Sequence, residues 1–111
     1  MNTNSILLFS GVLALANFTV GCDSKQEEAR EAAVERKADN LEERADKIRE
    51  NAEAAADKVE DKADAMREGD TDEMTEASAD AVEETADVIR DAAERRADAL
   101  EERADDVRER K

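Results

Sequence analysis

A four-residue pattern, Ala-Asp-x-Φ with Φ a large aliphatic residue, recurs eight times along the charged part of the chain. Within each half the copies start at intervals of seven, eleven and seven positions, and an interval of sixteen separates the halves. The repeating unit is therefore eighteen positions long, with one seven-residue and one eleven-residue step. The copies begin at Ala38, Ala45, Ala56, Ala63, Ala79, Ala86, Ala97 and Ala104.

Eighteen residues make five turns of an α-helix. Because the seven-residue step falls short of whole turns by about 20° and the eleven-residue step overshoots by about as much, the apolar positions stay on one side of the helix. In one unit this stripe is Ala38, Leu41, Ala45, Ile48 and Ala52. Ala and charged residues fill most other positions, and no Pro interrupts them. The pattern predicts an all-α fold of long amphipathic helices with an eighteen-residue (7 + 11) repeat.

The two halves of the repeat meet near Gly69. Five extra residues, 74–78, would rotate the stripe by roughly 140° if the helix continued. Segment 69–73 has the order of a C-capping Gly, an acidic N-cap and an acidic first turn. We therefore expect an antiparallel helical hairpin with arms 26–68 and 74–111 and a turn at 69–73. The alternative is one long bent helix that oligomerises.

The ends of the helical part carry their own signals. Ser24 and Glu27 match a capping box, which predicts that the first helix begins at Ser24. Arg108, Arg110 and Lys111 end the chain, where cations favour a helix C-terminus.

Segment 1–21 differs from the rest, because every basic and every acidic residue of the chain lies in 22–111. Residues 6–20 form a mostly apolar run that is shorter than the roughly 20 residues of a bilayer span. Such a run is typical of a secretory signal peptide. We expect a signal peptide at 1–21 and a lipid-anchor junction at 22–25.

The run ends at Thr19-Val20-Gly21-Cys22, which resembles the lipobox of bacterial lipoproteins. Gly21 and Cys22 match that family, whereas Thr19 stands where it usually has Leu. The resemblance implies cleavage between Gly21 and Cys22, lipidation of Cys22, and anchoring in the bacterial cell envelope facing the periplasm, in an undetermined membrane. Two alternatives are cleavage after an A-x-A pattern that ends at Ala16, and an uncut leader.

The composition of the chain argues against several kinds of catalysis and binding. The chain has no His, one Cys and a net charge of −15. These values disfavour imidazole catalysis, an ordinary zinc site and nucleic-acid binding. We expect no enzyme activity, cofactor or small-molecule substrate. The acids Asp70, Asp72, Glu73 and Glu76 lack the spacing of an EF-hand, so we interpret them as capping residues rather than a metal site.

Four motif copies place Asp three residues before Arg. These pairs predict a solvated salt-bridged face, or contacts that set the register between arms. They are Asp46–Arg49, Asp64–Arg67, Asp87–Arg90 and Asp105–Arg108.

The final Arg110-Lys111 is similar to the end of the murein lipoprotein family, which has a lipidated N-terminal Cys and a helical body. In that family the last Lys is joined to peptidoglycan, so the resemblance implies attachment through Lys111. Glu109 stands where the family has an aromatic residue.

These observations predict a lipid-anchored cell-envelope protein that acts as a structural or interaction element through an acidic helical hairpin or coiled coil. Its expected partners are the membrane, through the anchor, and a second copy or a helical protein. One alternative resembles late-embryogenesis-abundant proteins, which are helical only conditionally. Another is a peptidoglycan-linked tether. Membrane binding by the stripe, as in 11-residue-repeat apolipoproteins, is disfavoured because the polar faces are net acidic.

Overall fold

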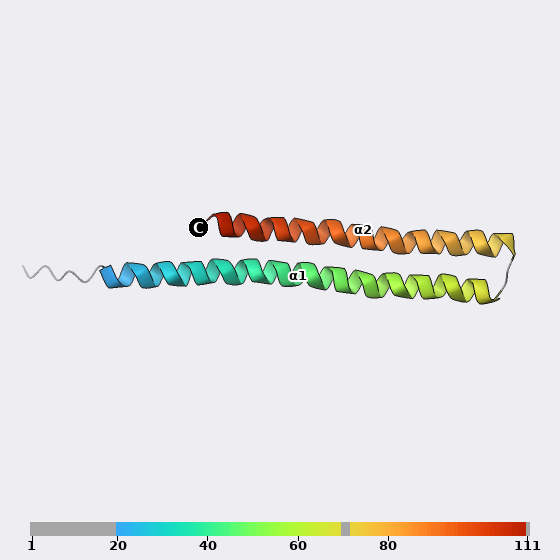
Figure 1. The fold of residues 1–111 in the computed structure, drawn as a ribbon, viewed down its shortest axis with the longest axis horizontal. Coiled ribbons are helices and arrows are strands. Elements are labelled where there is room, and N and C mark those ends of the chain that lie inside the picture. The colour runs from blue at the N-terminus through green and yellow to red at the C-terminus, as the bar shows by residue number, and fades with distance from the viewer. Residues whose placement is uncertain (1–19, 70–71, 111) are drawn as a thin grey trace, which may run out of the picture.

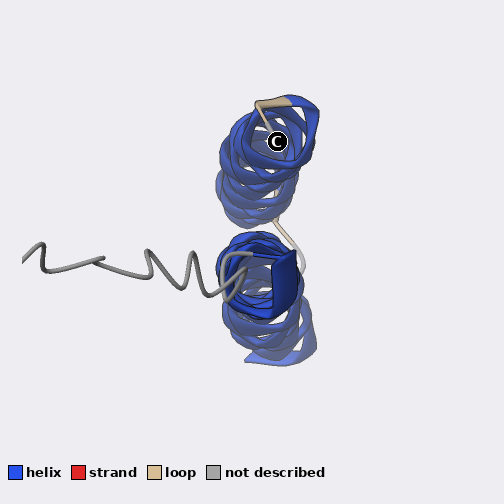
Figure 2. Ribbon diagram, turned by 90° about the vertical axis from the view of Figure 1, so that its left-hand side faces the viewer, coloured by secondary structure: helices blue, strands red, loops and turns tan. Residues whose placement is uncertain are grey.

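The computed structural model describes the backbone of residues 20–69 and 72–110, and the side chains of residues 24–69 and 72–110. Helix α1 runs Val20–Gly69 and helix α2 runs Glu73–Glu109. The two helices lie side by side and antiparallel, as two perpendicular views show (Figures 1 and 2). The predicted all-α antiparallel hairpin is confirmed.

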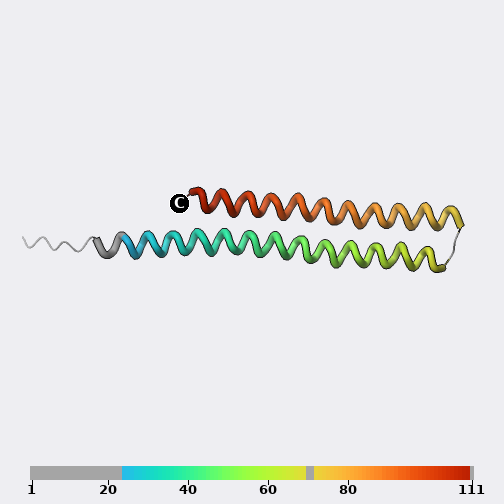
Figure 3. The backbone as a smooth tube through the Cα atoms, viewed as in Figure 1, coloured from blue at the N-terminus to red at the C-terminus, as the bar shows by residue number. Residues whose placement is uncertain are grey.

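Helix α1 begins earlier than the capping pattern indicates. Its first residue is Val20, so Ser24 lies inside the helix and the predicted capping box is wrong. Regular helical hydrogen bonds from the preceding turn already serve the N–H groups that a cap at Ser24 would satisfy. The N-terminal part of α1 extends past the end of α2 (Figures 1 and 3), and the side chains of residues 24–33 are exposed.

The turn is closed by a side-chain cap on α2. Asp72 is the N-cap, with extended backbone angles (φ −79°, ψ 160°), and its carboxylate accepts a hydrogen bond of 2.7 Å from the Thr75 N–H. Gly69 ends α1, but its φ is not positive, so it does not form the left-handed C-cap that the sequence suggests. The acidic cap therefore fixes the start of α2 without a left-handed glycine at the end of α1.

The contact between the helices is a seam of alanines. All eight motif alanines are fully buried, with 0% exposure, and Ala93 is buried as well. Among the described residues no larger side chain is fully buried. The eight large aliphatic residues are only half-buried beside the seam, because the small alanine side chains allow a close approach of the two backbones. Those residues are Leu41, Ile48, Val59 and Met66 on α1 and Val82, Ile89, Leu100 and Val107 on α2.

Candidate functional site

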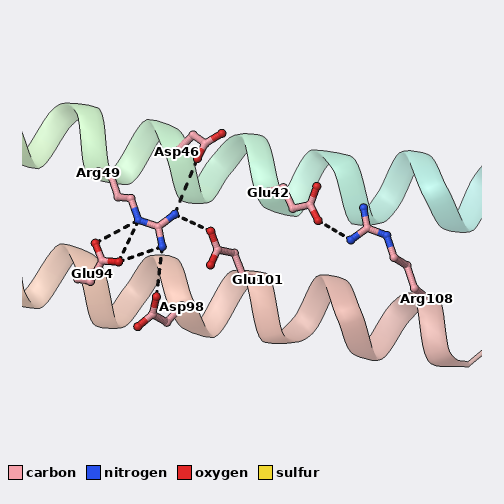
Figure 4. A network of polar contacts seen from close by, with 7 residues as sticks. All are labelled: Glu42, Asp46, Arg49, Glu94, Asp98, Glu101 and Arg108. Carbon is pink, nitrogen blue, oxygen red and sulfur yellow. Dashed lines mark hydrogen bonds and ion pairs between the residues drawn. The ribbon is translucent and has the colours of Figure 1, made fainter.

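Four arginines reach across the hairpin, and each meets three carboxylates of the opposite helix. We call each such group a clasp. Arg49 shows the arrangement (Figure 4): its Nε lies 3.1 Å from a Glu94 oxygen, its Nη2 3.2 Å from Asp98, and its Nη1 2.5 Å from Glu101. The guanidinium thus uses its whole fork of donors on one short segment of α2.

The clasps repeat one sequence pattern. In each, the acids come from an eight-residue segment, Glu-x-x-Ala-Asp-x-Φ-Glu, whose Ala belongs to the seam. The arginine always follows the Φ residue of a copy on the other helix. The four clasps are Arg49 with Glu94, Asp98 and Glu101; Arg67 with Glu76, Asp80 and Glu83; Arg90 with Glu53, Asp57 and Glu60; and Arg108 with Glu35, Asp39 and Glu42.

The clasps hold a single antiparallel register. Arg67 is one whole repeat unit nearer the turn than Arg49, and its partner Glu83 is one whole repeat unit nearer the turn than Glu101. The repeat length on one helix therefore equals the repeat length on the other, and every clasp closes at the same offset. Because the three acids of a clasp lie about one helical turn apart, a slip of α2 by one turn would leave each arginine beside only part of its clasp.

The Asp–Arg pairs expected three residues apart are present but secondary. Asp46 lies 3.8 Å from Arg49, and the other three pairs are 3.7 Å apart, longer than every clasp contact. Those four aspartates are also 73–81% exposed. The cross-helix carboxylates, and not these neighbours, hold the guanidinium groups in place.

Clasp contacts shift the ionisation of both partners. The hydrogen bond from each arginine lowers the pKa of the last glutamate in its clasp, although partial desolvation acts in the opposite direction. The same hydrogen bonds raise the pKa of the four arginines. Three carboxylates meet one guanidinium, so every clasp keeps a net negative charge. The affected glutamates are Glu42, Glu60, Glu83 and Glu101.

The seam has two different flanks. Successive helical residues are turned by about 100°, so each Φ residue lies about 60° to one side of its seam alanine, and the Glu or Arg that follows it lies about 40° to the other. Two shallow hollows near the middle of the hairpin show the difference. Both include Ala52 and Ala93, but one, of about 370 Å³, is lined by Ile48 and Ile89. The other, of about 320 Å³, is lined instead by clasp residues such as Arg90.

We call these the apolar flank, defined by the eight Φ residues, and the clasp flank, defined by the four clasps. Both helices contribute to each flank. A two-fold axis perpendicular to the plane of the two helices exchanges α1 and α2, and rotation about this axis keeps equivalent residues on the same side of that plane. Neither hollow joins a nucleophile to a base. Among the described residues, no group of three or more His, Cys, Asp or Glu side chains is placed to hold a metal ion.

The acids near the turn have separate structural roles. Asp72 caps α2, and Glu76 lies 3.2 Å from Arg67 within a clasp. Asp70, the third acid of that cluster, lies outside the described residues.

The predicted modification sites fall at the edges of the described part. Gly21 and Cys22 lie in the first turn of α1, and their side chains are outside the described set, as is Lys111. The leader, residues 1–19, is also outside it. Among the described helices, none is long and apolar enough to cross a membrane.

Sequence reasoning missed the clasps, although their signal is in the chain. The residue after Φ alternates strictly between Glu and Arg in successive copies. Antiparallel folding sets each basic copy opposite an acidic one, so this alternation pairs every Arg with a Glu. The first glutamate of each segment, such as Glu53, had no role in the sequence interpretation and completes the clasp at 3.1 Å from Arg90.

No protein-family model matches this chain, and no curated protein or solved structure matches it either. The fold and site therefore define only a structural class, an antiparallel two-helix hairpin with an alanine seam and a ladder of arginine clasps.

Proposed function

We propose that this chain is a lipid-anchored cell-envelope protein whose clasped hairpin acts as a structural or interaction element. The clasp ladder is the observation that supports this most. It uses four arginines and twelve carboxylates to hold a shape. A long hairpin with one defined register is suited to present a surface at a distance from its attachment point.

The sequence at the start of α1 suggests that attachment point. The uncharged leader ends at Cys22, the single Cys of the chain, and α1 begins at Val20. An anchor on Cys22 would join the first turn of the helix directly, without a flexible linker. With a rise of about 1.5 Å per residue, the 50 residues of α1 extend about 75 Å.

Intact mass spectrometry of the protein from fractionated cells tests this proposal. The expected species begins at Cys22, carries acyl chains and is found in the membrane fraction. The Cys22→Ser variant is the matched control, and it should lose acylation and keep the leader. A native protein recovered at full length, unacylated and in the soluble fraction would refute the anchor.

The alanine seam favours a second candidate, a conditionally folded helical protein. No side chain larger than Ala is fully buried in the described part, so little apolar area opposes the entropy of ordering two long helices. Circular dichroism separates the candidates. A cooperative melt at micromolar concentration supports a standing hairpin, whereas little helix before trifluoroethanol or drying supports conditional folding.

The hairpin bears on the tether alternative as well. Arg108, near the end of α2, pairs with Glu35, Asp39 and Glu42 of α1. The C-terminal end of α2 thus lies beside residues 35–42 of α1, and the part of α1 before them extends beyond α2. Peptidoglycan fragments on Lys111 after muramidase digestion would support a tether, and an unmodified Lys111 would exclude it.

A further inference from the structure

The two flanks of the hairpin differ sharply in charge. At the positions one and five residues after each seam alanine, which turn towards the clasp flank, all sixteen residues are Asp or Glu. The positions bordering the apolar flank lie one residue before, two after and six after each seam alanine. These border positions hold eight basic residues and one acid, Asp106. The basic residues are Lys37, Arg44, Lys47, Lys58, Lys62, Arg96, Arg103 and Arg110.

Contacts in the structure place this basic border beside the apolar residues. One shallow hollow of about 250 Å³ is lined by Leu41 and Val107 together with Lys37 and Arg103. In the central hollow, Arg96 lies beside the two isoleucines of the apolar flank. Long basic side chains can lay their apolar stems along such a surface while their charges point outward.

The apolar-flank side also carries exposed apolar side chains. Met74 and Val88 are the large apolar residues that the structure leaves exposed among those described, at 80% and 58%. Helical spacing puts both on the apolar-flank side, five residues before and two residues after a seam alanine. The half-buried Φ row and these two residues form an apolar band along the hairpin, bordered by positive charge.

Although the net acidic charge of the polar faces disfavoured membrane binding at the level of sequence, we propose that the apolar flank docks lengthwise on an anionic lipid surface, with its Lys and Arg border against the headgroups. An apolar face flanked by basic residues is the pattern of helices that lie in a membrane interface. The band is straight because the repeat unit closes five whole turns, so it suits a flat surface. The acids lie on the opposite flank, about one helix diameter or 10 Å away, where salt screens their repulsion from the lipid.

Charge complementarity selects the lipid over a second copy of the chain. Two hairpins packed apolar flank to apolar flank would set one basic border against another. Anionic headgroups would neutralise both borders of one hairpin at once. This docking goes beyond the anchoring role, because it assigns a lipid-binding surface to the folded hairpin itself and does not require acylation of Cys22.

A pair of single-tryptophan variants tests the docking, since the chain contains no Trp or Tyr. Thr85→Trp places the probe on the border of the apolar flank, and Asp87→Trp places it on the clasp flank of the same helix. Both positions are exposed. The full chain with Cys22→Ser is mixed with phosphatidylcholine vesicles that contain phosphatidylglycerol. Both variants lack acylation and keep the same leader, so the difference between the two probes reports docking of the flank separately from the anchor.

We expect the indole of the Thr85→Trp variant to shift to the blue and to be quenched by brominated lipid, and the indole of the Asp87→Trp variant to stay in water. The control is biased against the proposal, because Asp87→Trp removes a negative charge. Two water-exposed probes would overturn the docking. A blue shift of the Thr85→Trp indole that depends on protein concentration in the absence of vesicles would assign the flank to a second copy instead. An equal blue shift with neutral vesicles would show that the basic border has no role in docking.

A matched pair of charge variants tests the border directly. Lys37→Gln with Arg96→Gln removes two border charges, and Arg36→Gln with Arg95→Gln removes two charges one residue earlier, turned away by about 100°. Net charge changes equally in both. In the Thr85→Trp background, the border pair should weaken binding to anionic vesicles by roughly tenfold more than the control pair. Equal losses would show that total charge, and not the border, controls binding.

Discussion

The two flanks of the alanine seam contribute to the hairpin through different kinds of contact. On the clasp flank, each arginine is 26–30% exposed and meets carboxylates that are 42–68% exposed, so directional contacts set the register. On the apolar flank, half-buried aliphatic residues pack without a preferred partner atom. The comparison teaches that in this chain apolar packing supplies attraction and ion pairing supplies the alignment.

Substitution in the shared seam should have the largest effect, because it separates both flanks at once. Ala56 is fully buried, and Ala56→Leu would push the helices apart at the middle. We expect a loss of about 1–3 kcal/mol in the free energy of unfolding, measured by urea denaturation. Ala54→Leu is the matched control, because Ala54 is exposed and should change stability little. Equal effects at the two positions would contradict the seam.

A truncation on the apolar flank should cost less. Ile89 is half-buried, so Ile89→Ala should lower the free energy of unfolding by about 1–2 kcal/mol, below most fully buried sites. This loss should be insensitive to NaCl, since it removes no charge. Urea titrations at low and high salt measure both properties.

Arg90, which follows Ile89 in the chain, tests the clasp flank. Arg90→Gln leaves Glu53, Asp57 and Glu60 without their shared cation, so we expect a smaller loss of stability that shrinks as NaCl screens the remaining repulsion. Ile89→Ala serves as the control at the neighbouring position. A loss of equal size at every salt concentration would show that Arg90 acts through the packing of its stem.

Acid should weaken the clasps selectively. The hydrogen bond from Arg67 holds the pKa of Glu83 below its ordinary value of 4.5. The stabilising contribution of Glu83 is therefore complete above about pH 4.5 and is lost as the pH falls through the lowered value. At neutral pH, Glu83→Gln should be less stable than the control Glu84→Gln, and thermal melts should show this gap closing on acidification. A gap that persists in acid would exclude ionisation as its cause.

The smallest expected effect concerns the end of α1. Gly69 has no positive φ, and a Cβ built there meets no atom within 4 Å. Gly69→Ala should therefore raise stability by up to about 1 kcal/mol, because it reduces the freedom of the unfolded chain without strain. A lower melting temperature would show that the turn needs a glycine, as the sequence pattern first suggests.

Local patterning predicted much of the fold. The seven- and eleven-residue steps predicted the seam alanines, and the insert at 74–78 with Gly69 predicted where the chain reverses. The helix start was predicted wrongly at Ser24, because α1 begins at Val20 and needs no cap there. Lipidation of Cys22 and attachment through Lys111 stay predictions, since the described side chains include neither residue.

The sequence by itself determined the helices, their apolar stripe and the reversal near Gly69, because these depend on residues close together along the chain. Only the tertiary structure decided that Arg49 meets Glu94, Asp98 and Glu101, since that contact depends on how far α2 slides along α1. It also decided that the Φ residues stay half-buried. Two helices that pack through alanines leave no space between them to bury a larger side chain. The apolar stripe of one helix does not show how much of its surface the other helix will cover.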